Sequence, residues 1–286
     1  MSAPRRLEFG WSPDVPDFRD ITCYAQPFSD ATQTHVDLRD EGLEFHAVTC
    51  EGSDATCSIA VLAMIDWQSR RWAGTPVDAS ASFVHHLTTT TEGGGGVRGV
   101  SLRSTVKTLL QFGAPPERLW PTQPRQLKEV PRRPELFGYS KQFEQLRYLR
   151  LDAWTFDQQA RLSSIRRWLA QGNPCVLGFA VPTTLMIEDS ASIPFDVDRG
   201  GTAGGSACVA VGYNDHFELR KSVNHPLIRP ESRSRGAILI RTCWGSDWGE
   251  SGYGWLPYAF VESRFACDAW AIIHPEWRDW EHGGFA

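Results

Sequence analysis

The chain has 286 residues, of which 41% are hydrophobic and 22% are charged, as in ordinary globular proteins. Its net charge of -5 gives no reason to expect a nucleic-acid partner. The first six residues include basic side chains but no apolar segment follows them, so they do not resemble a secretory signal. No apolar run is long enough to predict a membrane span. We therefore expect a cytoplasmic protein without membrane contact.

The cysteine spacing does not show the paired clusters of zinc sites. In a chain of this length without a secretory signal, free buried thiols are the expectation, and we expect no metal and no cofactor. The seven cysteines are Cys23, Cys50, Cys57, Cys175, Cys208, Cys243 and Cys267.

Residues 1–20 are rich in Pro and Asp and predict an extended arm. The apolar segment that starts at Cys57 predicts a helix over residues 57–73, buried on most sides, with Asp54 and Thr56 as candidate N-caps. Gly74 is expected to end this helix. Residues 88–96, four threonines followed by Glu and four glycines, predict a flexible loop.

A second amphipathic helix is predicted over residues 101–112, ended by Gly113, and residues 115–134 predict an irregular stretch. The pattern changes near Leu151. A helix containing Leu162 and Leu169 is followed by strand-like runs separated by turn residues. These strands are expected at residues 175–181, 207–213, 237–241 and 269–274.

Helices followed by strands indicate an α+β fold. We expect one domain over residues 1–286, with a helical lobe over about 21–150, a mainly β lobe over about 151–275 and a cleft between them. Residues 276–286 are expected to form a tail.

Four segments of the chain resemble the papain-like cysteine peptidase family in order and spacing. They are Val36–Arg39 with Cys50–Ala60, Ser101–Gly113, Gly204–Tyr213, and Ile240–Trp255 with its Trp-Gly-x-x-Trp-Gly-x-x-Gly-Tyr-Gly-Trp run. The resemblance spans roughly residues 8 to 275 and is strongest to short bacterial members without a long inhibitory pro-segment. It implies a helical left lobe and a right lobe like a β-barrel, with a peptide-binding cleft between them.

The resemblance also implies roles for individual residues. Cys57 takes the position of the nucleophile, while Ser206 takes that of the catalytic His and Thr242 that of the Asn that orients it. Glu51 takes the position of the Gln that donates to the oxyanion. The implied substrate-cleft residues are Gly99, which matches a family Gly, Val100, which departs from the pattern, Gly205, Trp244 and Trp248.

These substitutions oppose the chemistry. A thiol attacks as its thiolate and needs a facing imidazole both to hold the ion pair and to protonate the leaving amine. Ser206 can do neither, and an ionised Glu51 would repel an oxyanion. Loss of the His of a hydrolase triad costs on the order of 10⁶ in kcat, roughly 8 kcal/mol. Conventional peptide hydrolysis is therefore predicted to be absent or very weak.

Three functions remain open. The first is a pseudo-peptidase that binds a peptide or protein segment in its cleft without cleaving it. The second is a Cys57-dependent acyl transferase or thioester-using enzyme, with a carrier-bound acyl group as partner and Glu51 as an unusual base. The third is an active peptidase whose base comes from elsewhere. The candidates for such a rescue are His85, His86, His216 and His225.

Overall fold

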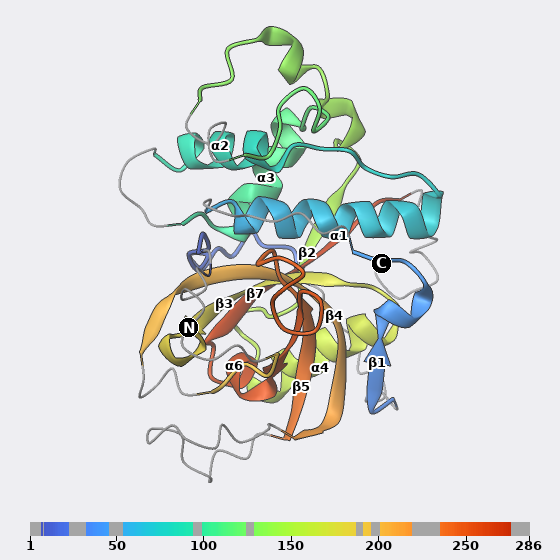
Figure 1. Cartoon of the computed structure of the whole chain (residues 1–286), viewed down its shortest axis with the longest axis vertical. Helices are drawn as coiled ribbons and strands as arrows, with labels where there is room; N and C mark the ends of the chain where they lie inside the picture. Colours follow the sequence, from blue (N-terminus) through green and yellow to red (C-terminus); the bar gives the residue numbers. More distant parts are fainter. Residues whose placement is uncertain are drawn as a thin grey trace.

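The computed structural model describes residues 7, 9–22, 33–45, 54–93, 99–123, 129–186, 191–195, 201–218 and 235–275. In Figure 1 a layer of helices lies on one side of the molecule and an antiparallel sheet on the other. The predictions for Glu51, Cys23, Cys50, His225 and the tail over 276–286 lie outside the described residues.

The helical layer contains α1 (Thr56–Ala73), α2 (Ala81–Thr91) and α3 (Leu102–Phe112). The helix α1 has buried side chains from Thr56 to Ser69, which agrees with the apolar sequence of its first half. It ends at Gly74, whose φ of 68° is in the left-handed region that favours glycine. The predicted N-caps are wrong, because Ala55 occupies the cap position and no side chain caps the helix.

The predicted loop over residues 88–96 is wrong at its start, because Thr88–Thr91 form the last turn of α2. Threonine favours helices weakly, yet each hydroxyl here donates back to a carbonyl of the preceding turn, for example from Thr88 to Val84 at 2.8 Å. Ser80 caps the other end by accepting from the amide of Phe83.

The sheet has the order β2-β7-β3-β4-β5-β6, with β1 paired to β4. Every pairing is antiparallel. The helices α4 (Gln158–Ala170) and α6 (Tyr258–Glu262) pack against it. The strands are β1 (His35–Asp37), β2 (Arg147–Arg150), β3 (Cys175–Pro182), β4 (Thr202–Glu218), β5 (Arg235–Arg241), β6 (Tyr253–Pro257) and β7 (Ala266–Ile273).

The four strands expected from the sequence are present as β3, β4, β5 and β7, and β4 is much longer than its apolar centre. The short strands β1, β2 and β6 were not predicted. Although β1 and β2 precede residue 151, both pair with strands of the sheet, so the chain contributes to the sheet before it builds the mainly β half. No helix in the described ranges is long and apolar enough to cross a membrane.

Candidate functional site

The thiol of Cys57 lies in the first turn of α1, at the boundary between the helical layer and the sheet. Its side chain is 0% exposed. Two main-chain carbonyl oxygens lie within hydrogen-bond distance of the sulfur and can share its single proton, that of Val100 at 3.4 Å and that of Gly10 at 3.7 Å. Both partners accept a hydrogen bond and neither can donate one, so this environment suits a neutral thiol and disfavours a thiolate.

The electrostatics of the site act in the same direction. Burial raises the pKa of the Cys57 thiol well above its ordinary value, and the negative charges of Asp14 and Asp268 raise it further. A hydrogen bond involving Thr56 acts in the opposite direction but is outweighed. The positive end of the α1 dipole would also favour the anion, by no more than about 1 kcal/mol. Cys57 is therefore a protonated thiol at neutral pH in this arrangement.

The segment around Ser206 lies directly against the start of α1. The amide of Ala207, the next residue on β4, donates to the hydroxyl of Thr56, the residue before Cys57, at 3.3 Å. Ser206 is completely buried, and its hydroxyl has no hydrogen-bond partner within the described residues. Thr242 follows β5, and its hydroxyl donates to the carbonyl of Gly252 at 3.4 Å. Neither hydroxyl can act as a base at neutral pH.

Two of the described histidines, His85 and His216, make side-chain contacts away from Cys57. His85 on α2 is buried and pairs through Nε2 with Asp54, three residues before Cys57, at 3.0 Å. His216 lies in the exposed part of β4 beyond Asn214, where its Nδ1 is 2.9 Å from Arg235. The structure thus gives the sulfur of Cys57 carbonyl partners and, within the described residues, no hydrogen bond to an imidazole.

Residues 9–14, which we call the inner arm, lie between the helical layer and the sheet beside Cys57 (Figure 1). The amides of Gly10 and Trp11 both donate to the carbonyl of Gly205, at 2.9 and 3.1 Å. On the other side the amide of Val100 donates to Gly10 at 2.9 Å, and the amide of Ser12 donates to Val100 at 3.0 Å. The inner arm therefore connects Gly205 of β4 on one side to Val100, just before α3, on the other through main-chain bonds. Trp11 and Val100 form a parallel β-bridge.

Glycines make this close approach feasible. Gly99 has φ of 102°, and a Cβ added there would lie 2.9 Å from the carbonyl carbon of Trp11. A Cβ at Gly205 would lie 2.7 Å from the Trp11 indole, and one at Gly204 would lie 2.6 Å from the ring of Phe9. The predicted cleft residues Gly99, Val100 and Gly205 are thus brought together around the inner arm.

The other predicted cleft residues, Trp244 and Trp248, form an edge-to-face pair with ring centroids 4.8 Å apart. Trp244 also packs beside Phe179 of β3, with the two ring centroids 5.8 Å apart. Trp248 is buried at 1% exposure. The structure places this pair against the sheet, and the main-chain contacts of the inner arm do not involve it.

A buried ion cluster anchors the inner arm. At its centre the guanidinium of Arg150, 1% exposed, lies 2.6 Å from Asp268 and 3.1 Å from Asp152. It also lies 3.4 Å from Asp14 and 3.3 Å from Asp20, which both belong to the arm. Buried charges are tolerated only when they are paired, so the arm carboxylates and the strand arginine depend on one another.

Arg103 of α3 connects the same cluster to the helical layer. Its guanidinium bonds Asp20 at 2.5 and 2.7 Å and the carbonyl of Val15 at 2.7 Å, and its amide donates to Asp14 at 3.1 Å. Arg150 belongs to the sheet and Arg103 to the helical layer. The arm therefore connects both layers through the carboxylates of Asp14 and Asp20.

Sequence reasoning missed the residues that hold the arm, Trp11, Asp14, Arg103, Arg150 and Asp268. Their ion pairs join positions as far apart as 14 and 268, and no local pattern reveals such a pairing. The two adjacent glycines at 204 and 205, together with Gly99, were a usable signal, because glycines on both walls permit another main chain to lie between them.

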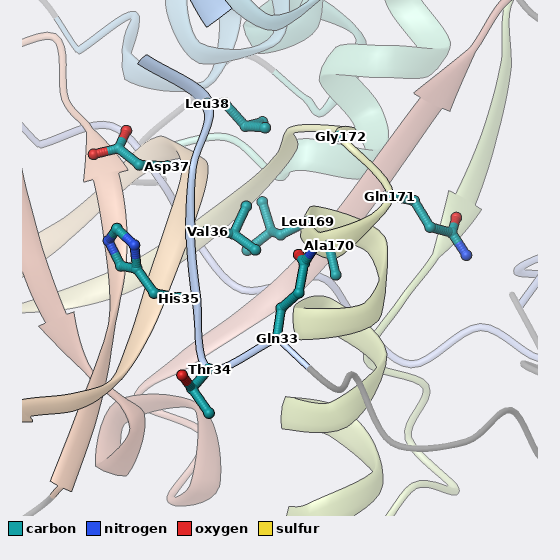
Figure 2. A pocket seen from close by; sticks show the side chains of 10 residues that line it. All are labelled: Gln33, Thr34, His35, Val36, Asp37, Leu38, Leu169, Ala170, Gln171 and Gly172. Atoms are coloured by element: carbon teal, nitrogen blue, oxygen red, sulfur yellow. The ribbon is translucent and has the colours of Figure 1, made fainter. Parts of the chain in front are cut away.

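A separate open groove has a volume of about 640 Å³, and Cys57 is not among the residues that line it (Figure 2). Strand β1 and the end of α4 form its walls, and Asp37, its only charged side chain, is already paired with Arg39 at 2.6 Å. None of the predicted site residues lines it. In the described part of the chain, no three His, Cys, Asp or Glu side chains form a group suited to a metal ion.

Solved structures with this arrangement identify the fold. The cysteine protease xylellain from Xylella fastidiosa superposes with a TM-score of 0.70 and 22% identity over 96% of this chain and 98% of that one. The cysteine protease and lectin-like domains of Cwp84, a surface layer associated protein of Clostridium difficile, superpose with a TM-score of 0.63 and 16% identity over 94% of this chain and 56% of that one. The chain therefore has the papain-like cysteine peptidase fold, a mixed α+β fold.

At the level of sequence, the chain is 28% identical over 182 residues to an uncharacterised peptidase C1-like protein of Acanthamoeba polyphaga mimivirus. The match covers 61% of this chain, which spans about half (51%) of that curated relative. No protein-family model matches the sequence.

Proposed function

We propose that this chain is a pseudo-peptidase, a papain-like domain whose cleft holds an extended peptide or protein segment without cleaving it. The observation that carries the proposal is the environment of Cys57, whose buried thiol lies within hydrogen-bond distance of the carbonyls of Gly10 and Val100. A thiol with a raised pKa and two carbonyl partners is a poor nucleophile. The side chains at the base and orienting positions, Ser206 and Thr242, cannot correct this.

The inner arm supports the binding half of the proposal. Its main chain bonds to Gly205 on one wall and to Val100 on the other, as an extended ligand would. The walls of the cleft therefore retain the groups that hold a peptide backbone, while the side chains needed to break it are replaced.

The acyl transferase alternative requires a thiolate at Cys57, and burial disfavours that state. The rescued peptidase requires an imidazole at the sulfur, whereas His85 is engaged with Asp54. Both alternatives would be supported only if displacement of the arm exposed a reactive thiol at Cys57. The test therefore includes a variant, Trp11→Ala, in which the contacts of the arm are weakened.

The full-length protein and its Cys57→Ala variant are incubated with a broad library of fluorescence-quenched peptides. The same pair is tested in a Trp11→Ala background, so that occlusion by the arm cannot account for a negative result. We expect no product that depends on Cys57 in either background. Turnover that is lost with Cys57→Ala would contradict the proposal.

A further inference from the structure

The indole of Trp11 occupies a space that exists because two residues of the sheet, Gly178 and Gly205, have no side chain. A Cβ at Gly178 of β3 would collide with the indole ring, and one at Gly205 of β4 would lie 2.7 Å from it. Trp11 is 6% exposed, so the ring is enclosed by the sheet. A floor of glycines on two neighbouring strands leaves a flat space suited to a large planar side chain.

A single acceptor lies where the indole N–H points. Trp11 Nε1 donates to Asp268 at 3.2 Å, and the other carboxylate oxygen of Asp268 accepts from Arg150 at 2.6 Å. Asp268 has φ of 58°, a left-handed conformation that is uncommon for residues other than glycine. The carboxylate of Asp268 is thus held in place by Arg150 and by its own backbone conformation. It favours an indole over a phenyl ring because only the indole has an N–H to donate.

The residue before the tryptophan must be glycine. A Cβ at Gly10 would collide with the carbonyl of Asp54. Three residues after the tryptophan, the carboxylate of Asp14 accepts from Trp270 Nε1 at 2.8 Å and from the amide of Arg103 at 3.1 Å. Together these contacts specify the pattern Gly-Trp-x-x-Asp in an extended chain.

From this geometry we infer that the cleft is a recognition site for extended protein segments of the form Gly-Trp-x-x-Asp, and that the chain's own inner arm is its tethered competitor. The inference rests on the proposed function and names the ligand class of the same site. The contacts described above for residues 10–14 are made by main-chain groups, an indole and a carboxylate, and a segment of another protein can present the same groups.

The test uses a fluorescein-labelled peptide with the sequence of residues 7–14, LEFGWSPD, and the full-length Trp11→Ala variant, in which the slot is vacant. Binding is measured by fluorescence anisotropy. We expect saturable binding to this variant and binding to the wild-type protein weaker by on the order of 10², because the tethered arm competes at a high effective concentration.

Altered peptides test the chemistry without altering the protein. Replacing Trp by Ala should weaken binding by more than about tenfold, with Phe intermediate because it fills the slot without donating to Asp268. Replacing Gly by Ala should abolish binding. The control is Pro→Ala at the exposed position 13, which should bind like the parent peptide.

Two results would overturn the inference. One is the absence of binding of the parent peptide to Trp11→Ala, and the other is equal binding of the Trp and Ala peptides. Mass spectrometry of the bound peptide keeps this result separate from the proposed function. A peptide that binds with the expected specificity and is then cleaved in a Cys57-dependent manner would support the recognition site and overturn the pseudo-peptidase.

Discussion

The arm contains two stretches of similar composition whose apolar side chains lie in opposite environments. In the inner arm, Trp11 and Asp14 are buried and bonded to both layers of the fold. In the following stretch, residues 15–21, which we call the outer arm, Val15, Phe18 and Ile21 are 77%, 99% and 63% exposed, and only the carboxylate of Asp20 is buried, in the ion cluster. The difference teaches that hydrophobicity alone does not attach the arm. The geometry of glycines and ion pairs does.

The largest expected effect is at the ion cluster. Arg150→Met removes the cation shared by Asp14, Asp152 and Asp268 and leaves their carboxylates buried without it. We expect a loss of about 3–5 kcal/mol in the free energy of unfolding, measured by urea denaturation.

The matched control for this prediction is Arg147→Met on the same strand. Arg147 is exposed, and among the described residues its guanidinium bonds to carbonyls close by in the sequence, so we expect a change within about 0.5 kcal/mol. A similar loss in both variants would show that the cluster does not anchor the fold.

The second prediction separates the arm from the cleft that it covers. Trp11→Ala should cost about 3 kcal/mol, the lower end for a buried aromatic, because the arm can leave the cleft and relieve the cavity. Departure of the arm would uncover Cys57, whose sulfur now contacts Gly10. We therefore expect iodoacetamide to label Cys57 at least about tenfold faster than in the wild type, as followed by intact mass and peptide mapping.

An unchanged labelling rate together with the full loss of stability would contradict this prediction. It would mean that the arm is an inseparable part of the core, as the inner arm's burial allows, and that no exchange with another segment occurs.

Much of this fold was predictable because local patterns report local structure. The apolar run after Cys57 and the strands at 175–181 and 237–241 are sequence features of buried elements, and the structure contains them. The strands β1 and β2 were missed because three or four residues are too few for a period to show.

The site was predictable only in part, for a physical reason. Cys57, Ser206 and Thr242 were assigned to site positions through a family resemblance carried by their neighbouring residues, and these roles stay predictions. The partners of the arm could not be assigned in this way, because the pairing of Asp14 with Arg150 depends on tertiary structure. The sequence therefore indicated the segments around Cys57 but not the arm that lies between them.

The third prediction concerns pH. Burial raises the pKa of Asp152 to about 6, with Arg150 acting in the opposite direction, and burial with the charge of Asp14 raises that of Asp268 as well. Between pH values of about 4 and 6, the folded state therefore keeps protons on these carboxyl groups that the unfolded state has released. Stability from these groups is complete below their ordinary pKa near 4 and is lost as pH rises through about 6 and above.

We expect the free energy of unfolding to fall by about 2 kcal/mol between about pH 4.5 and about pH 7.5, measured by urea denaturation in buffers of constant ionic strength. Asp152→Asn removes one of the titrating groups and should flatten the slope. A stability that rises over this interval would show that the carboxylates are already ionised in the folded protein.

The smallest expected effect is in the outer arm. Phe18 is almost fully exposed although it lies in a turn closed by the bond from the Asp20 amide to Asp17 at 3.2 Å. Phe18→Ala should change the free energy of unfolding by no more than about 0.5 kcal/mol and leave the alkylation rate of Cys57 at its wild-type value. If Phe18→Ala instead accelerates labelling as Trp11→Ala is expected to, the exposed apolar side chains of the outer arm also hold the inner arm in place, in addition to the ion pairs of Asp20. Hydrophobic contacts would then contribute to the attachment of the arm, and the contrast between the apolar side chains of its two stretches would be wrong.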